Sequence, residues 1–193
     1  MARLLLKTPH GKEFEQNMKT LIVYTSQTGF TKKYAQWMAE SLGADVLELK
    51  EAQKKDVAFF DAYEAIVYAA WVMASTVVKV KWFLGKAENW KGKKLAIVSV
   101  GGSPVDNPDV DVMLDKLLTD EQKQYIRAFY CQGGFDYDKM NAPSRFAMKM
   151  FRTSLKNSKD EKNRQVAAMI DHSYDISDRK YIAPVVGYIN GRE

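Results

Sequence analysis

The sequence predicts an α/β fold in which helices cover both faces of a doubly wound, five-stranded parallel sheet. Two observations favour this fold. Short apolar, β-branched segments alternate along the chain with segments whose apolar residues recur at helical spacing, as is typical of a parallel sheet with crossover helices. Residues 64–70, EAIVYAA, form an almost unbroken apolar run, as expected for a strand in the middle of such a sheet.

The predicted strands and helices follow one another in a regular order. We expect strands at residues 19–25, 44–49, 64–70, 93–100 and 125–132. We expect helices at residues 30–43, 76–90, 109–118 and 177–189. Gly43 is a natural end for the first helix, and Ser177 is the expected N-cap of the last one. Pro184 lies inside that last helix, which it should bend or shorten.

The chain divides into a short extension and one domain. Residues 1–17 precede a second methionine, Met18, and they contain a Pro-His-Gly turn signal without the rhythm of the following segments. We interpret them as an N-terminal extension that carries no chemistry. Residues 18–193 are long enough for one domain with a full core, and the segment lengths leave no room for a second domain.

The composition excludes several classes of protein. A single cysteine, Cys131, rules out an internal disulfide, and no Cys/His set has the spacing of a zinc site. The longest apolar run, residues 65–74, is far too short to span a bilayer, so we expect a cytoplasmic protein. The formal net charge of +5 agrees with simple solubility, anionic lipid or an acidic partner, but it is too modest and diffuse to predict nucleic-acid binding.

Polar residues gather where the first strand gives way to the first helix. Residues 25–31, TSQTGFT, hold four hydroxyl residues around one glycine. A helix N-terminus exposes unpaired N–H groups that stabilise an anion, and Gly29 allows the backbone to approach closely. Because one Ser or Thr would suffice as a cap, the stretch predicts a phosphate site built from neutral donors, with an ordinary capping loop as the alternative. It is neither a Walker loop nor a dinucleotide fingerprint.

Extended to residues 23–43, this stretch resembles the first strand, phosphate loop and first helix of flavodoxins. More narrowly, it resembles the flavodoxin-domain subgroup that includes menaquinone-dependent protoporphyrinogen oxidase. Residues 98–104, 130–140 and 174–189 support the resemblance, which covers the chain from Met18 to its end. The resemblance implies a flavodoxin-like fold and FMN as the cofactor, with the 5′-phosphate in the first loop and the isoalloxazine ring between two later loops.

The resemblance also implies which residues bind FMN. The phosphate loop corresponds to Ser26, Gln27, Thr28, Gly29, Phe30 and Thr31. The first ring-binding loop corresponds to Ala70, Trp71, Val72 and Met73. The second corresponds to Gly101, Gly102 and Ser103, whose backbone N–H groups would meet the pyrimidine edge of the ring. No catalytic side chain and no metal ligand is expected.

The first ring-binding loop departs from the pattern of the family. Relatives usually carry a glycine in this loop, whereas residues 69–76 contain none. Trp71 has two interpretations: it stacks on the flavin, or it forms a wall of the core and even intrudes on the ring site.

A basic amphipathic segment, residues 141–159, follows the fifth predicted strand. A helix from about Ser144 would place apolar and basic side chains on different sides. The apolar side holds Phe146 or Ala147, Met150, Phe151 and Leu155, and the basic side holds Arg145, Lys149, Arg152 and Lys156. Such a helix either meets a membrane surface or a quinone-bearing partner, or it packs on the edge of the sheet with its basic side in water, which is the simpler interpretation.

Two functions agree with these features. The first is an FMN-binding electron-transfer protein that shuttles electrons between redox partner proteins, with the flavin carrying the chemistry. The second is an FMN-dependent dehydrogenase, similar to protoporphyrinogen oxidase, that passes electrons to a quinone at the inner face of the membrane. The basic segment favours the second function, whereas the lack of a clear acid–base pair at the ring loops does not. We expect the electron carrier and leave the oxidase as the alternative.

Overall fold

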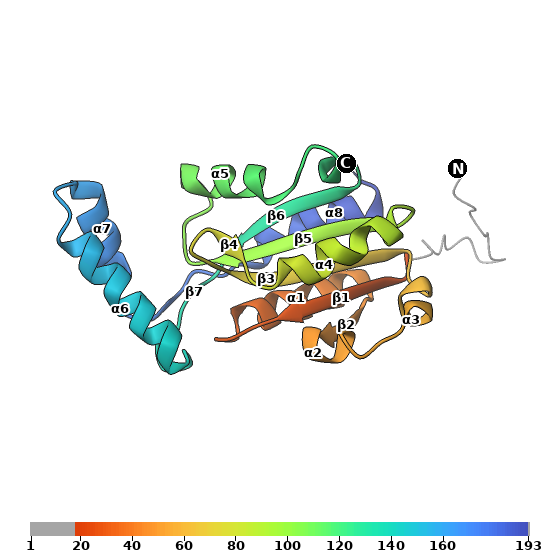
Figure 1. The fold of residues 1–193 in the computed structure, drawn as a ribbon, viewed down its shortest axis with the longest axis horizontal. Coiled ribbons are helices and arrows are strands. Elements are labelled where there is room, and N and C mark those ends of the chain that lie inside the picture. The colour runs from red at the N-terminus through yellow and green to blue at the C-terminus, as the bar shows by residue number, and fades with distance from the viewer. Residues whose placement is uncertain (1–17, 193) are drawn as a thin grey trace, which may run out of the picture.

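The computed structural model describes residues 18–192, so the extension expected at residues 1–17 lies outside the described part of the chain. Helices cover both faces of one central sheet (Figure 1). Its parallel strands are β1 (Thr20–Thr25), β2 (Asp45–Glu48), β3 (Ala65–Met73), β5 (Lys94–Gly101) and β6 (Ile126–Gln132). They lie in the order β2-β1-β3-β5-β6. The predicted doubly wound, five-stranded parallel sheet is therefore confirmed.

The strand order reverses at β1, which lies between the edge strand β2 and the central strand β3. The chain passes from β1 outward to β2 and then returns to β3 on the other side of β1. The register sets Thr25 opposite Ala70 and Trp71 opposite Val100, so the carboxyl ends of β1, β3 and β5 meet at one edge. In doubly wound sheets, ligands bind at such a reversal, outside the carboxyl ends of the strands.

Two groups of helices bury the two faces of this sheet. The α-helices are α1 (Phe30–Leu42), α2 (Leu49–Ala52), α3 (Val57–Asp61), α4 (Val80–Ala87), α5 (Pro108–Leu117), α6 (Ala142–Lys156), α7 (Glu161–Met169) and α8 (Ala183–Asn190). Single 3₁₀ turns are η1 (Glu88–Trp90), η2 (Gln122–Gln124) and η3 (Arg179–Ile182). Buried residues of α1 and α8 pack on one face, and those of α2, α3, α4 and η1 pack on the other.

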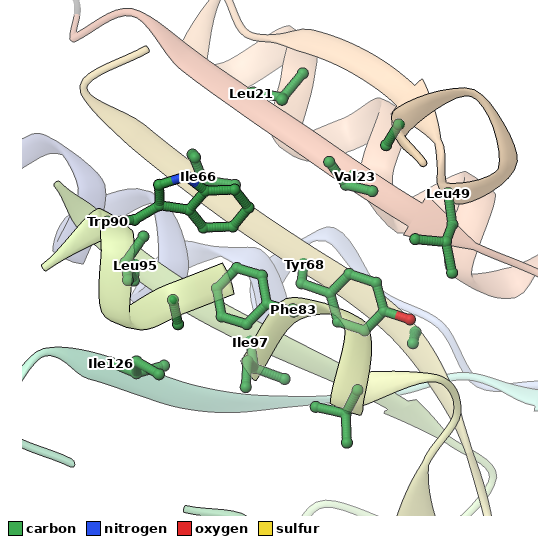
Figure 2. Close-up of a cluster of buried hydrophobic side chains, with 14 of the residues drawn as sticks. Leu21, Val23, Leu49, Ile66, Tyr68, Phe83, Trp90, Leu95, Ile97 and Ile126 are labelled. Atoms are coloured by element: carbon green, nitrogen blue, oxygen red, sulfur yellow. The ribbon is translucent and has the colours of Figure 1, made fainter. Parts of the chain in front are cut away.

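Successive residues of each strand point to opposite faces and supply both halves of the core. Ile22 is buried with α1, whereas its neighbours Leu21 and Val23 are buried with α4. In Figure 2, aromatic side chains from β3 and α4 lie against each other on this second face. The ring centroids of Tyr68 and Phe83 are 5.7 Å apart in a stacked pair. These non-local contacts hold the strand ends in place.

The predicted helix at residues 76–90 is wrong in its first part. Thr76–Val77 form the short strand β4, which pairs antiparallel with the end of β3 and sets Val77 opposite Val72. Lys79 then takes a positive φ of 56°, and helix α4 begins only after it. β-Branched residues favour a pleated pairing where a neighbouring strand is available, so this tertiary pairing prevails over the helical spacing.

The beginning of the last predicted helix also differs. Ser177 does not cap it; instead, the side chain of Asp178 accepts a hydrogen bond from the Lys180 N–H at 2.9 Å and caps η3. Helix α8 follows from Ala183, so Pro184 lies in its first turn. A proline there removes no hydrogen bond of the helix, so the helix is shorter than the predicted residues 177–189, one of the two expected effects of Pro184, and needs no bend.

Helices α6 and α7 form an arm that projects from the body of the domain (Figure 1). The arm leaves the body through β7 (Gly134–Phe135) and returns through β8 (Tyr174–Asp175), which pair antiparallel. Helix α6 has no buried residue. The interpretation of this segment as a helix packed on the sheet edge is therefore wrong, because α6 packs mainly against α7. Among residues 18–192, no helix is long and apolar enough to cross a membrane.

Candidate functional site

The carboxyl edge of the sheet brings together the three segments that the sequence singled out. The loop of residues 26–29 joins β1 to α1, the end of β3 lies beside it, and residues 101–103 follow at the end of β5. The parallel register fixes this arrangement through the backbone hydrogen bonds between the strands. The pairing of the strands therefore determines where the site lies, and side chains add hydrogen-bond donors and packing contacts to it.

The loop before α1 leaves hydrogen-bond donors without protein partners. Gly29 occupies the N-cap position with a φ of 102°, a left-handed conformation that favours glycine. Its N–H donates to the Ser26 hydroxyl at 3.1 Å. No side chain caps the helix, and within residues 18–192 no acceptor faces the first-turn N–H groups of Phe30, Thr31 and Lys32.

Thr31 adds a buried hydroxyl to this loop. The residue is 1% exposed, and its Oγ1 has no hydrogen-bond partner within residues 18–192. A buried hydroxyl without a partner carries a desolvation cost, and side chains of a helix lean towards its N-terminus. Unused N–H groups and an unused hydroxyl at one helix start are more than a capping loop requires, and they fit an anion such as a phosphate monoester.

A lysine beside the loop is engaged in other contacts. The Lys33 Nζ contacts Asp175 Oδ2 at 2.9 Å and the Ser177 hydroxyl at 2.8 Å. Partial burial acts to raise the pKa of Asp175, but hydrogen bonds from Ser177 and Lys33 bring it below its ordinary value. Asp175 therefore stays ionised and keeps Lys33 occupied, which leaves the loop as a cradle of neutral donors.

The first predicted ring-binding loop is shorter than expected. Strand β3 continues to Met73, so all four residues predicted for this loop are strand residues: Ala70, Trp71, Val72 and Met73. The Ala70 side chain is fully buried in the core, and only its backbone faces this edge. Trp71 and Val72 are half-buried, and Met73 is 49% exposed. Among the described residues Trp71 contacts no other aromatic ring, so stacking of its indole on a flavin stays a prediction.

The turn between β3 and β4 has a backbone conformation typical of glycine although it contains no glycine. Ala74 and Ser75 have positive φ values of 48° and 56°. Two consecutive positive φ values are typical of the tight hairpin turns that usually contain Asn or Gly, and each costs roughly 1–3 kcal/mol in a residue with a side chain. The chain thus adopts a glycine-like backbone here without a glycine, and the antiparallel pairing of β4 maintains it.

The second ring-binding loop presents its N–H groups away from the body. The carbonyl oxygens of Gly101, Gly102 and Ser103 accept hydrogen bonds from the Gly133 N–H at 2.6 Å, the Tyr174 hydroxyl at 2.8 Å and the Tyr130 hydroxyl at 2.7 Å, respectively. Within the described chain the N–H groups of Gly102 and Ser103 have no acceptor. The loop therefore offers two adjacent donors, as a planar ring with a polar edge requires.

Aromatic side chains pack closely against both glycines of this loop and leave no room there for a Cβ atom. A Cβ atom added to Gly101 would lie 2.6 Å from the Tyr130 hydroxyl, and one added to Gly102 would collide with the ring of Phe135. The sequence analysis missed Tyr130, Phe135 and Tyr174 as the side chains that pack against this loop and support it from the protein side. Paired glycines signal that something packs closely against them, but they do not reveal which residue does so.

A groove in the arm adjoins these aromatic side chains. It encloses about 730 Å³, and its lining includes Tyr137, Phe146, Arg145, Lys149 and Arg152. The ring of Tyr137 stacks on Phe135 at a centroid distance of 6.3 Å, which connects the groove to the Gly102 loop. Arg152 pairs with Asp171, whereas Lys149 forms no ion pair within residues 18–192.

Other candidate groups play no part in the site. Cys131 is buried, and burial raises its pKa to about 12, so the thiol stays protonated. Within residues 18–192, no cluster of His, Cys, Asp and Glu could hold a metal ion.

Taken together, the donors at the start of α1 and in the Gly102 loop suit a phosphate monoester joined to a planar polar ring, and FMN fits this description.

We predict that Thr31→Val separates anion binding from helix capping. The variant removes a buried hydroxyl that has no partner, so the free energy of unfolding of the FMN-free protein should stay unchanged or rise by about 1 kcal/mol. The affinity for FMN should fall about ten-fold or more, which corresponds to about 1.4 kcal/mol. Urea unfolding and a fluorescence titration measure the two effects.

Ser41→Ala is the matched control for this prediction. Ser41 lies in the last turn of the same helix and donates to the Trp37 carbonyl at 3.0 Å. Its loss should leave the affinity for FMN unchanged. Equal FMN affinities for Thr31→Val and the unaltered protein would show that the Thr31 hydroxyl does not contact the phosphate.

Comparison with known proteins identifies a family for most of the chain. The family model of the flavodoxin domain matches residues 21–163, well over half of the chain. No curated protein matches the chain.

Solved structures resemble the chain at low sequence identity. The flavodoxin of Streptococcus pneumonia TIGR4 is 18% identical over 78% of this chain and 96% of that one, with a TM-score of 0.41. Oxidised flavodoxin 1 from Bacillus cereus is 14% identical over 79% and 96%, with a TM-score of 0.40. A flavoprotein from Lactobacillus acidophilus NCFM, in complex with FMN, is 17% identical over 60% and 92%, with a TM-score of 0.40. The assignment of the chain to a family rests on the family model, whose match extends from β1 into α7. By that match, the chain belongs to the flavodoxin domain family.

Proposed function

We propose that the protein binds FMN at the carboxyl edge of its sheet and carries electrons between redox partner proteins. The observation that supports this most directly is the set of unused donors at that edge. These are the first-turn N–H groups of α1, the Thr31 hydroxyl and the N–H groups of Gly102 and Ser103. They suit a phosphate at one end and the polar edge of a flavin at the other.

The chain's own residues hold and orient the cofactor in this proposal. When bound, FMN supplies the redox chemistry. The start of α1 neutralises the phosphate without a lysine, and the Gly102 loop donates to the ring. Residues 25–31 and 70–76 contain no carboxylate and no imidazole, and residues 101–107 contain one carboxylate, Asp106, and no imidazole. The loops thus provide no acid–base pair for a separate substrate, which favours a carrier over an enzyme.

The phosphate loop makes a specific prediction about ligand choice. Riboflavin carries the same ring as FMN without the phosphate, so its affinity should be lower by on the order of 100-fold, because charge-assisted hydrogen bonds contribute roughly 1.5–3 kcal/mol each. Titration of the flavin-free protein with each compound, followed by flavin fluorescence, measures the ratio. A colourless protein that ignores FMN would overturn the proposed function, and equal affinities would overturn the role of the loop.

The alternative function is that of the protoporphyrinogen-oxidase-like subgroup, an FMN-dependent dehydrogenation with transfer of electrons to a quinone. One observation favours it: the arm groove, lined by Arg145, Lys149 and Arg152, connects through Tyr137 to the ring loop. Such a groove suits an apolar molecule with carboxylate groups.

Turnover of the FMN-bound protein distinguishes the two functions. We expect the oxidation of protoporphyrinogen with a menaquinone analogue to proceed no faster than with free FMN at the same concentration. A rate well above that of free FMN would overturn the proposed carrier function and support the oxidase function.

We further propose that the arm contacts an anionic lipid surface. Helix α6 carries Arg145, Lys149, Arg152 and Lys156 and no acidic residue. Its large apolar side chains face outward: Phe146 is 66% exposed, Met150 56% and Phe151 52%. A helix with exposed apolar residues and cations alone has the composition of segments that lie in the headgroup region of anionic membranes.

Vesicle flotation tests the lipid contact. The full chain should float with vesicles that contain phosphatidylglycerol and remain behind with pure phosphatidylcholine vesicles. Lys149→Gln combined with Lys156→Gln should weaken binding by roughly 30-fold, at about 1 kcal/mol for each lysine. The control pair Lys81→Gln and Lys116→Gln changes two exposed lysines of α4 and α5 and should have little effect. If both double variants lost the same vesicle affinity, the net charge of the protein would account for the binding, and the proposed contact of the arm would be overturned.

A further inference from the structure

The direction of the Ser103 N–H depends on one tyrosine. In a trans peptide, the C=O of one residue and the N–H of the next point in opposite directions. The Gly102 carbonyl accepts the Tyr174 hydroxyl at 2.8 Å, so the N–H of Ser103 in the same peptide points away from Tyr174. That N–H is one of the two donors of the ring loop that no acceptor of the described chain occupies.

We propose that Tyr174 is a positioning residue for the flavin: its hydroxyl fixes the Gly102–Ser103 peptide and so turns the Ser103 N–H towards the edge of the ring. The inference rests on the proposed binding of FMN and adds to it a residue from a strand remote in sequence.

Several contacts hold Tyr174 in the required position. Strand β8 sets it opposite Phe135 of β7, and the two rings meet edge to face at a centroid distance of 5.3 Å. Phe135 in turn packs against Gly102. Burial raises the pKa of Tyr174, so the hydroxyl stays protonated and donates throughout the physiological range. Phe135 therefore places the ring of Tyr174, while its hydroxyl contacts the loop.

The neighbouring tyrosine provides a matched control within the same loop. The Tyr130 hydroxyl donates to the Ser103 carbonyl at 2.7 Å, and burial raises its pKa in the same way. The Ser103 carbonyl belongs to the peptide bond between Ser103 and Pro104, and proline has no N–H. Tyr130→Phe therefore loses a comparable hydrogen bond without redirecting any donor, whereas Tyr174→Phe frees the peptide that carries the Ser103 N–H.

The test compares both variants of the full chain by their FMN affinity and by the midpoint potential of the bound flavin. Hydrogen bonds to charged groups are stronger than those to neutral ones, so Tyr174→Phe should lose about ten-fold more affinity for reduced than for oxidised FMN. That ratio corresponds to a midpoint potential lower by about 30 mV for a two-electron couple. The visible spectrum of bound FMN should shift as well, and Tyr130→Phe should leave the potential unchanged.

The outcomes separate this inference from the function on which it rests. An unaltered protein that does not bind FMN would remove the proposed function. Normal FMN binding with equal potentials in Tyr174→Phe and the unaltered protein would overturn only the role of Tyr174, as would equal shifts in both variants. If Tyr174→Phe proves unfolded by circular dichroism, the Ser103 amide of the ¹⁵N-labelled unaltered protein decides: a downfield shift upon FMN addition supports the inference, and its absence overturns it.

Discussion

The parallel pairing of β1 with β3 is the constraint on which the rest of the molecule depends. Both strands are buried, so each must connect to its parallel neighbour through a helix that crosses a face of the sheet. That requirement sets the start of α1 beside the end of β3, with Thr25 opposite Ala70. The pairing of β3 with β5 then adds the Gly101–Ser103 loop to the same edge. Three separate stretches of sequence become one site because of backbone ladders, and the aromatic packing of Tyr68 and Phe83 stabilises the strands that carry them.

Local features could be predicted from the sequence, and features that depend on distant partners could not. The apolar runs, the Gly43 helix end and the donor-rich loop at Gly29 all express preferences of neighbouring residues, and the structure contains each of them. The β4 hairpin replaced a predicted helix because pairing with β3 outweighed helical spacing. The contact of Tyr174 with the ring loop could not be predicted for a similar reason, because its hydroxyl donates to the carbonyl of Gly102, a residue 72 positions away.

Net charge proved a poor guide to the electrostatics of the site. The formal value of +5 conceals a separation of charge between two helices. Helix α5, which follows the ring loop, carries Asp109, Asp111 and Asp115 against a single lysine, Lys116, whereas the charged residues of α6 in the arm are all cations. Fields of exposed charges decay within about 10 Å at moderate ionic strength, so each helix dominates its own surroundings. A basic chain can therefore present an acidic surface next to the ring loop and a basic one on the arm.

The arm enters and leaves the body through two strands that already pair with each other. Since Phe135 lies opposite Tyr174, residues 136–173 form an excursion from the tip of a hairpin whose two ends are neighbours. The entropy of closing such an excursion grows only slowly with its length, by about 0.6 kcal/mol for each doubling. Insertion, shortening or exchange of this segment would thus leave the sheet and its carboxyl edge almost undisturbed. The fold thus separates the sheet with its carboxyl edge from an accessory segment that can change in length or sequence without altering the strand pairing.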